Sequence, residues 1–270
     1  MPSRSIAFLG AGHLATALVR GLLAQKICPP ADLVCTSKSG VSAQRLAAET
    51  GIAFEPDLPR LLATADTVVV AFKPQSLATA DPRLAALTVG KLVISVLAGR
   101  RLARLTETFP HARNLVRLLP NTPAAIRAGI TGWCAAQKLS DSDHVTVRQI
   151  LDALGTHAEV PEEQLDAITA LGGSGPAFVY EFVAALRDGG VAAGLPAETA
   201  AKFALETVLG SARLLARSGA TPEQLRDQVA SPNGTTAAGL QVLAARQFRE
   251  TVRETILAAT RRAGELARDA

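Results

Sequence analysis

The stretch Gly10-Ala11-Gly12-His13-Leu14-Ala15 decides the fold of the first half of the chain. It follows an apolar strand candidate, Ser5–Leu9, and opens a helix candidate, Leu14–Ala24. The first glycine permits a tight turn, the second lets a diphosphate approach the backbone, and the small Ala15 lets the helix pack closely on the strand. The helix start also offers N–H groups and the positive end of the helix dipole. The pattern predicts a dinucleotide site contacted by Gly10, Gly12, His13 and Leu14, with a plain glycine turn as the alternative.

Strand and helix patterns alternate through the first 160 residues. Most strand candidates are apolar throughout, as expected for parallel strands that are covered on both faces, and helix candidates such as Val41–Glu49 separate them. Such alternation implies right-handed crossovers and a doubly wound sheet, so we expect residues 1–160 to form one α/β domain. The strand candidates are Ser5–Leu9, Leu33–Thr36, Thr67–Ala71, Leu92–Val96, Asn114–Leu118, Thr131–Ala135 and Thr156–Val160.

The pattern changes to long helices after Pro161. Prolines stand at the predicted helix starts, where the missing N–H costs little, and Gly194 and Gly219 stand where helices should stop. We expect residues 161–270 to form an all-α domain, and its Ala- and Leu-rich helices favour packing across a dimer interface. The helix candidates are Pro161–Leu171, Pro176–Ala193, Pro196–Ser218, Pro222–Val229, Thr235–Ala245 and Phe248–Arg268.

Composition excludes several classes of protein. Among the 270 residues, 48% are hydrophobic and 19% charged, which excludes a disordered chain. The net charge is +4, but the arginines are dispersed and lack interleaved aromatic residues, so no nucleic-acid partner is expected. Three cysteines argue against a disulfide framework and favour a reducing, cytoplasmic location. No apolar run is long enough to span a membrane, and no His/Cys cluster has metal-ligand spacing.

The second strand candidate indicates which dinucleotide binds. A site for NAD normally has an acid after this strand, which accepts hydrogen bonds from the ribose 2′-hydroxyl. Here the strand ends in Val34-Cys35-Thr36-Ser37-Lys38-Ser39, with no acid, and Arg45 follows nearby. Ser37 and Lys38 suit a 2′-phosphate, so NADPH is favoured and NADH is the alternative. A solvated loop charge is the simpler interpretation of Lys38.

Two further turns fall at the carboxyl ends of predicted strands, where ligands bind in doubly wound folds. Ala71-Phe72-Lys73-Pro74 places Lys73 near a phosphate or a ribose and Pro74 against the ribose or adenine, and Ala71 adds a backbone contact. Leu119-Pro120-Asn121-Thr122-Pro123 is a rigid loop in which Asn121 suits the nicotinamide carboxamide. A structural Pro-Asn turn is an open alternative. We also assign Ala98, after the strand candidate Leu92–Val96, to the cofactor.

Two polar segments lie in the predicted helical part. Leu171-Gly172-Gly173-Ser174-Gly175-Pro176 interrupts two helix candidates; Ser174 suits a helix cap, and three glycines suggest close approach to a ligand or to another backbone. Ser231-Pro232-Asn233-Gly234-Thr235-Thr236 gathers N–H groups and hydroxyls at the start of a helix. The second segment predicts an anion site that fits a small carboxylate, whereas an ordinary helix cap would need only one hydroxyl.

No Ser/His/Asp arrangement or catalytic carboxylate pair accompanies these motifs. A dinucleotide enzyme without an evident acid or base suits hydride transfer to an electrophile that is already activated, such as a protonated C=N bond.

Together these motifs resemble the pyrroline-5-carboxylate reductase family over essentially the whole chain. The resemblance rests on Gly10–Ala15, Ala71–Gln75, Leu119–Pro123, Asp166–Ala177 and, most specifically, Asp227–Thr236. It implies a Rossmann domain followed by a helical dimerisation domain, with the active site at the dimer interface and dimers that assemble further, up to a decamer of five dimers. It also implies reduction of L-1-pyrroline-5-carboxylate to L-proline by NAD(P)H, the last step of proline biosynthesis.

The resemblance assigns roles to matching positions. Ser231, Gly234, Thr235 and Thr236 would hold the substrate carboxylate, and Thr236 would also lie near the imine nitrogen as the catalytic candidate. Gln228 and Ser174 would line the same pocket. Three residues depart from the usual pattern, namely His13, Gly172 and Asn233, and none of them removes a group assigned to chemistry.

Two other functions compete with this one. A reductase of another imine or of a β-hydroxyacid would share the architecture, but the hydroxyacid enzyme needs a lysine on the long helix, and Lys202 lies away from the glycine segment. A non-catalytic regulatory protein that binds a dinucleotide would bind NADPH without turnover.

Overall fold

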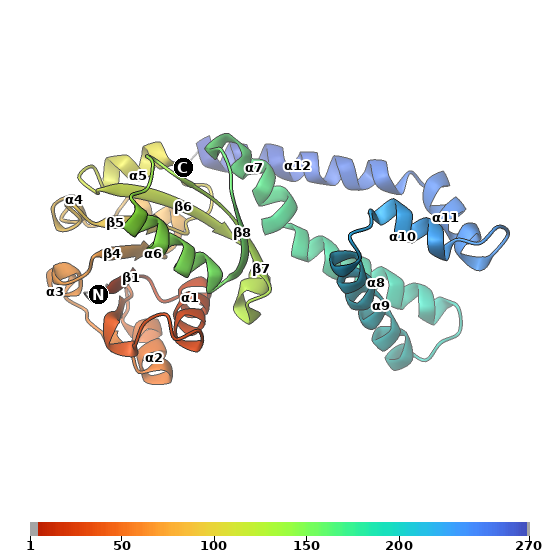
Figure 1. The fold of residues 1–270 in the computed structure, drawn as a ribbon, viewed down its shortest axis with the longest axis horizontal. Helices are drawn as coiled ribbons and strands as arrows, with labels where there is room; N and C mark the ends of the chain where they lie inside the picture. The colour runs from red at the N-terminus through yellow and green to blue at the C-terminus, as the bar shows by residue number, and fades with distance from the viewer. Residues whose placement is uncertain (1–4, 269–270) are drawn as a thin grey trace. The chain divides into compact units, whose positions relative to one another are not determined.

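The computed structural model describes residues 5–268, and the chain divides into two compact units (Figure 1). The first, here called the sheet unit, contains the chain up to Ser174 and again from Ala259. The second, the helical unit, is Gly175–Ala258. The sheet unit therefore extends beyond the predicted boundary at residue 160, and the assignment of residues 161–270 to one helical domain stays a prediction.

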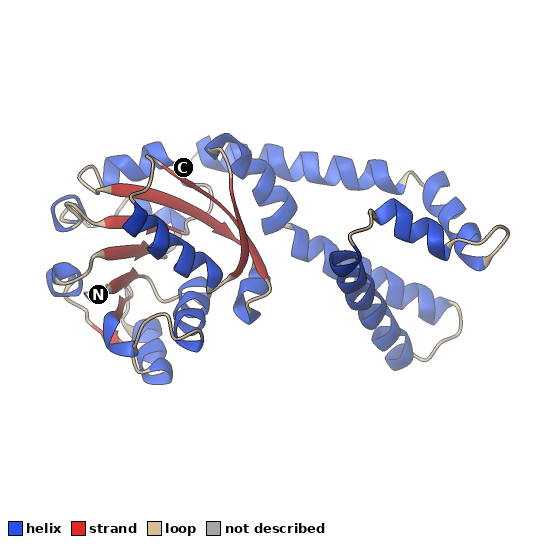
Figure 2. Cartoon of the chain, in the orientation of Figure 1, coloured by secondary structure: helices blue, strands red, loops and turns tan. Residues whose placement is uncertain are grey.

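The sheet unit is built on eight strands within the described residues, in the order β3-β2-β1-β4-β5-β6-β7-β8. Figure 2 shows these strands in red and the helices in blue. Neighbouring strands are parallel except β6 and β7, which are antiparallel. The parallel centre confirms the predicted doubly wound sheet. The strands are β1 Ile6–Leu9, β2 Leu33–Thr36, β3 Ala53–Phe54, β4 Thr67–Val70, β5 Leu92–Ser95, β6 Asn114–Pro120, β7 Gly129–Ala135 and β8 Gly155–Glu159.

Helices cover both faces of this sheet, because central strands such as β4, with its three valines, are buried at every position. One core cluster joins the sheet to α1, α2 and α6 through side chains such as Leu18, Leu46 and Ile150. The other joins it to α3, α4 and α5 through Leu61, Leu84 and Leu105. The helices of this unit are α1 His13–Ala24, α2 Val41–Thr50, α3 Leu58–Ala63, α4 Leu84–Leu87, α5 Leu102–Thr108, α6 Asp141–Asp152 and α7 Leu165–Ile168.

A buried ion pair explains why residues beyond 160 belong to the sheet unit. Arg117, on β6, is 1% exposed, and its Nη1 donates to Glu162 Oε1 at 3.1 Å. The same oxygen accepts the Leu102 N–H at 2.7 Å, at the start of α5. Leu165 follows on α7 and packs fully buried against β6 and β7 side chains. The segment after β8 is therefore fixed to the sheet by charge and by apolar packing.

The helical unit contains long helices with tight ends. Gly219 adopts a left-handed conformation, with φ of 68°, directly after α9, and it ends that helix as predicted. Within this unit Phe182 and Phe248 pack with ring centroids 6.2 Å apart. The helices are α8 Gly175–Ala192, α9 Ala197–Ser218, α10 Pro222–Val229, α11 Thr235–Ala245 and α12 Phe248–Arg268, of which α12 ends in the sheet unit. Between residues 5 and 268, no helix has the length and apolarity that a bilayer span requires.

Candidate functional site

The turn after β1 depends on a glycine. Gly10 has a φ of +119°, and its N–H donates to the Thr36 carbonyl at 3.0 Å. A Cβ atom at this position would lie 2.5 Å from the Ala71 carbonyl group and 2.6 Å from the Phe72 nitrogen. The backbone after β1 therefore lies directly against the backbone after β4, and only glycine fits between them.

The start of α1 is open toward solvent and lacks a side-chain cap. Gly12 precedes the helix, no side-chain hydrogen bond caps it among the described residues, and a Cβ there would meet nothing within 4 Å. His13 is exposed, whereas Ala15 is fully buried, which allows the close packing of helix on strand. Uncapped N–H groups beside open space fit the diphosphate of a dinucleotide.

The turn after β2 carries the residues predicted to select the cofactor. Ser37 Oγ accepts the Ala43 N–H at 3.2 Å, which ties the turn to α2, and Lys38 is exposed. Arg45 Nε lies 3.9 Å from Glu49 Oε1, so the two side chains form an ion pair. Ser37 and Lys38 remain the predicted partners of a 2′-phosphate.

The turns after β4 and β5 contact each other. Lys73 is exposed, and its carbonyl accepts the Ser76 N–H at 2.8 Å in a short 3₁₀ turn. Ala98 is exposed in the turn that follows β5. The Pro74 carbonyl accepts a hydrogen bond from Arg100 Nε at 3.0 Å. Sequence reasoning did not single out Arg100, which lies two residues after Ala98 in the turn that follows β5.

Asn121 has a structural partner. Its Oδ1 accepts the Ile130 N–H at 3.0 Å, which fixes the loop between β6 and β7. This bond supports the structural alternative for the carbonyl oxygen. The side-chain NH₂ group of Asn121 remains the predicted donor to the nicotinamide carboxamide.

The glycine segment before α8 differs from the expectation. Leu171–Pro176 does not interrupt the helical path, since Thr169–Gly173 forms a π-helical turn that continues through Ser174 into α8. Ser174 has helical dihedral angles, φ −84° and ψ −25°, instead of the extended geometry of a cap. The predicted break and cap are therefore wrong, because glycines tolerate the wider turn. Single π turns are frequent at functional sites, and Ser174 stays a predicted pocket residue.

The start of α11 has the geometry of an anion site within the helical unit. Asn233 is left-handed, with φ of 57°, so the turn retains its form without a glycine at that position. A Cβ on Gly234 would lie 2.4 Å from Ser231 Oγ, so the serine hydroxyl lies directly against the backbone that opens the helix. In the part of the chain that the structure describes, no side-chain hydrogen bond caps α11 at Gly234.

The neighbouring helix provides an internal comparison. α10 has a full capping box, in which Thr221 Oγ1 accepts the Gln224 N–H and Gln224 Oε1 accepts the Thr221 N–H. α11 has three nearby hydroxyls, on Ser231, Thr235 and Thr236, and no such cap. The hydroxyls are therefore not explained by capping. Gln228 lies exposed near the end of α10.

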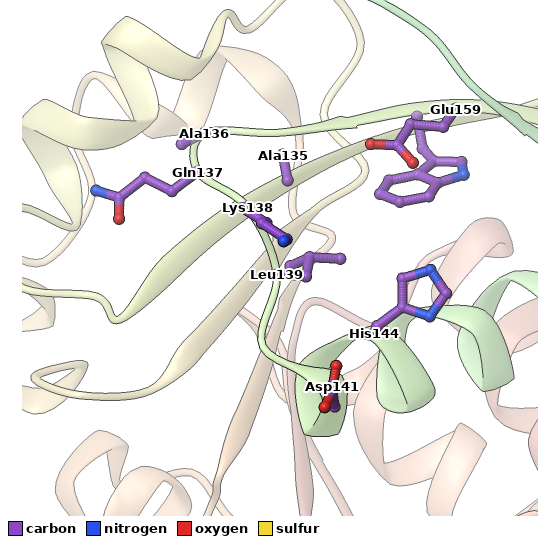
Figure 3. Close-up of a pocket in the computed structure, with 9 residues that line it drawn as sticks. Ala135, Ala136, Gln137, Lys138, Leu139, Asp141, His144 and Glu159 are labelled. Carbon is purple, nitrogen blue, oxygen red and sulfur yellow. The ribbon is translucent and has the colours of Figure 1, made fainter.

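The predicted residues thus fall into two groups. The cofactor candidates and Ser174 lie in the sheet unit, and the other substrate candidates lie in the helical unit. A separate hollow of about 580 Å³ lies beside β7, β8 and α6, where His144, Glu159 and Lys138 line it (Figure 3). It contains none of the predicted site residues. Among residues 5–268, no group of three His, Cys, Asp or Glu side chains is placed to hold a metal ion.

Replacing Gly12 by alanine tests the dinucleotide turn. Because the methyl group would enter open space, the thermal midpoint should match that of the parent. The same methyl group would occupy the path of the diphosphate, so the NADPH dissociation constant should rise about 10-fold, measured by calorimetry. Gly10→Ala is the matched comparison, since its Cβ would meet backbone atoms and lower the thermal midpoint. Unchanged NADPH binding in Gly12→Ala would remove this turn from the site.

Comparisons with known proteins agree across both units. Residues 162–266 match the family model for pyrroline-5-carboxylate reductase dimerisation, and residues 5–99 match the model for NADP oxidoreductase, coenzyme F420-dependent. The chain is 40% identical to the pyrroline-5-carboxylate reductase of Synechocystis, with 98% of each chain covered.

Solved structures give the same result. A pyrroline-5-carboxylate reductase from Coxiella burnetii is 32% identical over 98% of each chain, with a TM-score of 0.91. A pyrroline carboxylate reductase from Plasmodium falciparum, with NADP bound, is 28% identical over 99% of each chain, with a TM-score of 0.86. With 40% identity over nearly its full length, the chain belongs to the pyrroline-5-carboxylate reductase family.

Proposed function

We propose that this chain reduces L-1-pyrroline-5-carboxylate to L-proline with NADPH, the last step of proline biosynthesis. One observation carries the proposal: the chain aligns over 98% of its length with a curated reductase of this name at 40% identity. The uncapped starts of α1 and α11 support it, because they supply the two anion sites that a dinucleotide and a carboxylate substrate require.

The residues of the sheet unit suit NADPH. Gly10, Gly12, His13 and Leu14 would hold the diphosphate, and Ser37 and Lys38 the 2′-phosphate. Ala71, Lys73, Pro74, Ala98 and Asn121 would contact the rest of the cofactor. NADPH supplies a hydride when bound, and the NADP in the Plasmodium falciparum structure is consistent with this choice.

The residues of the helical unit suit the substrate. The N–H groups at the start of α11 and the hydroxyls of Ser231 and Thr235 would bind the carboxylate and so fix the ring. Thr236 is half-buried, and its hydroxyl would donate to the carboxylate or orient the ring nitrogen. A protonated C=N bond carries its own positive charge, so these residues contribute position instead of proton transfer.

The exposed apolar side chains of the helical unit support self-association. The described residues of α8, α10 and α11 contain no buried side chain, and one unpartnered chain would leave a large apolar surface in water. A second copy of this chain would cover them, in a homodimer with the active site at its interface. These side chains include Val179, Tyr180, Phe182, Leu186, Phe203, Leu205, Leu214, Val229, Val242 and Val252.

The larger assembly and the location are parts of the same proposal. We place the enzyme in the cytoplasm, because Cys28, Cys35 and Cys134 are all unpaired. A decamer of five dimers is the proposed limit of assembly, to be measured by light scattering.

Consumption of NADPH and NADH, followed by absorbance with pyrroline-5-carboxylate, tests the function. Piperideine-carboxylate and a hydroxyacid couple serve as control substrates. Turnover of pyrroline-5-carboxylate that is fastest with NADPH is the expected result. Turnover of only a control substrate would indicate the related imine or hydroxyacid reductase, and NADPH binding without any turnover would indicate a regulatory protein.

A further inference from the structure

Arg100 makes a contact that joins the turns after β4 and β5, at the carboxyl ends of these parallel strands. It follows β5 in the turn that contains Ala98, and the whole residue is 9% exposed. Its Nε donates to the Pro74 carbonyl at 3.0 Å, across 26 residues of chain. A donor at a nearly buried position is shielded from competing water, so its hydrogen bond holds the Pro74 carbonyl firmly.

The carbonyl that Arg100 binds belongs to the turn after β4. Pro74 opens the 3₁₀ turn directly after Lys73, and Lys73 is the residue predicted to reach the cofactor. The same turn begins at Ala71, against which the Gly10 backbone lies with no room for a Cβ. The turns after β1, β4 and β5 therefore form one connected series of contacts.

The turn that carries Arg100 is itself fixed from its other side. Leu102 donates its N–H to Glu162 at 2.7 Å, and Arg101 Nη2 donates to Asp166 at 3.2 Å. The two residues that follow Arg100 are thus anchored, and the Arg100 side chain transmits that fixed position to Pro74. Loss of this hydrogen bond would release the Lys73-Pro74 turn while the fold remains.

We propose that Arg100 is a positioning residue for the dinucleotide, which acts through the Pro74 carbonyl and does not touch the cofactor. The proposal rests on the proposed function, because it needs NADPH as the ligand of this edge. It predicts that the Nε donor matters and that the guanidinium charge does not.

Two variants of similar length separate the donor from the charge. Arg100→Gln retains an N–H donor at the position of Nε, whereas Arg100→Met places a methyl group there. Arg104→Met is the control, because Arg104 pairs with Glu107 on the exposed surface of α5. NADPH dissociation constants are measured by calorimetry without substrate, and KM for each substrate, kcat and thermal midpoints are measured alongside.

Arg100→Met should raise the NADPH dissociation constant and KM about 10-fold. Its kcat at saturating NADPH and its KM for pyrroline-5-carboxylate should stay within about twofold of the parent. Arg100→Gln and Arg104→Met should bind NADPH as the parent does.

Equal losses of NADPH affinity in Arg100→Gln and Arg100→Met would overturn the proposal in favour of a direct contact between the guanidinium charge and the cofactor. Normal NADPH binding by Arg100→Met would also overturn it, because the hydrogen bond to Pro74 would then have no effect on binding. If Arg100→Met does not fold, Arg100→Leu takes its place, because leucine also lacks a donor. A loss of NADPH affinity of about 10-fold in Arg100→Leu, with parent-like affinity in Arg100→Gln, supports the proposal, and any other combination refutes it. Failure of the parent itself to bind NADPH would instead refute the proposed function.

Discussion

The kcat/KM for pyrroline-5-carboxylate should fall roughly 10–100-fold when Thr236 is replaced by alanine, with a raised KM, because one or two charge-assisted hydrogen bonds are lost. Thr236 is the second residue of α11, at a helix start that no side chain caps in the described part of the chain. Its hydroxyl is therefore available to the substrate, and its removal should cost the helix little. Steady-state kinetics at saturating NADPH measure the effect.

Thr236→Ser is the matched control, since it retains the hydroxyl and should recover most of the activity. The NADPH dissociation constant should not change in either variant, because Thr236 is assigned to the substrate. Parent-like kinetics in Thr236→Ala would remove Thr236 from this role.

The second large effect concerns stability. Glu162→Gln should lower the free energy of unfolding by about 3 kcal/mol, because it leaves the buried guanidinium of Arg117 without a counter-charge. Nε and Nη2 of Arg117 have no hydrogen-bond partner among the described residues, so the Glu162 carboxylate is its main compensation. This predicted loss of stability is at the lower end of the range that is usual for a broken buried ion pair, because the Glu162 side chain is 29% exposed.

A double variant separates the charge from the packing. Arg117→Met combined with Glu162→Gln should recover more than half of the lost stability, since a neutral apolar side chain no longer needs a partner. Glu163→Gln, at the exposed neighbouring position, should change the free energy by less than about 0.5 kcal/mol. Urea unfolding at one fixed protein concentration measures all three, because self-association adds to apparent stability. A loss in Glu162→Gln no larger than in Glu163→Gln would contradict the prediction.

The sequence predicted the α/β alternation well because the strands of the sheet centre are apolar throughout. It did not reveal β3, because Ala53–Phe54 is a two-residue strand whose pairing depends on β2. It also did not reveal that β7 runs antiparallel to β6. The direction of β7 depends on the path of the short loop through Asn121, which turns the chain back alongside β6. A hydrophobic pattern carries no information about strand direction.

Candidate site residues were predicted from local motifs, whereas residues that act through distant partners were not predicted. The helix starts after Gly12 and Gly234 follow from local motifs, and neither carries a side-chain cap among the described residues. Arg100 and Arg117 act through partners that lie 26 and 45 residues away, which no local pattern shows. The only signal for Arg117 was a charge inside an otherwise apolar strand, which implies a buried partner.

The return of α12 from Ala259 onward gives the helical unit two covalent connections to the sheet unit. A protease that cuts near Ser174 alone would divide the chain into two fragments, and the fragment that carries the helical unit would still contain the end of α12 that belongs to the sheet unit. Release of the helical unit without any residue of the sheet unit therefore requires two cuts. A deletion that removes the last turns of the chain would take away a piece of the nucleotide-binding half, where Leu266 lies beside Gly99, and not a dispensable tail.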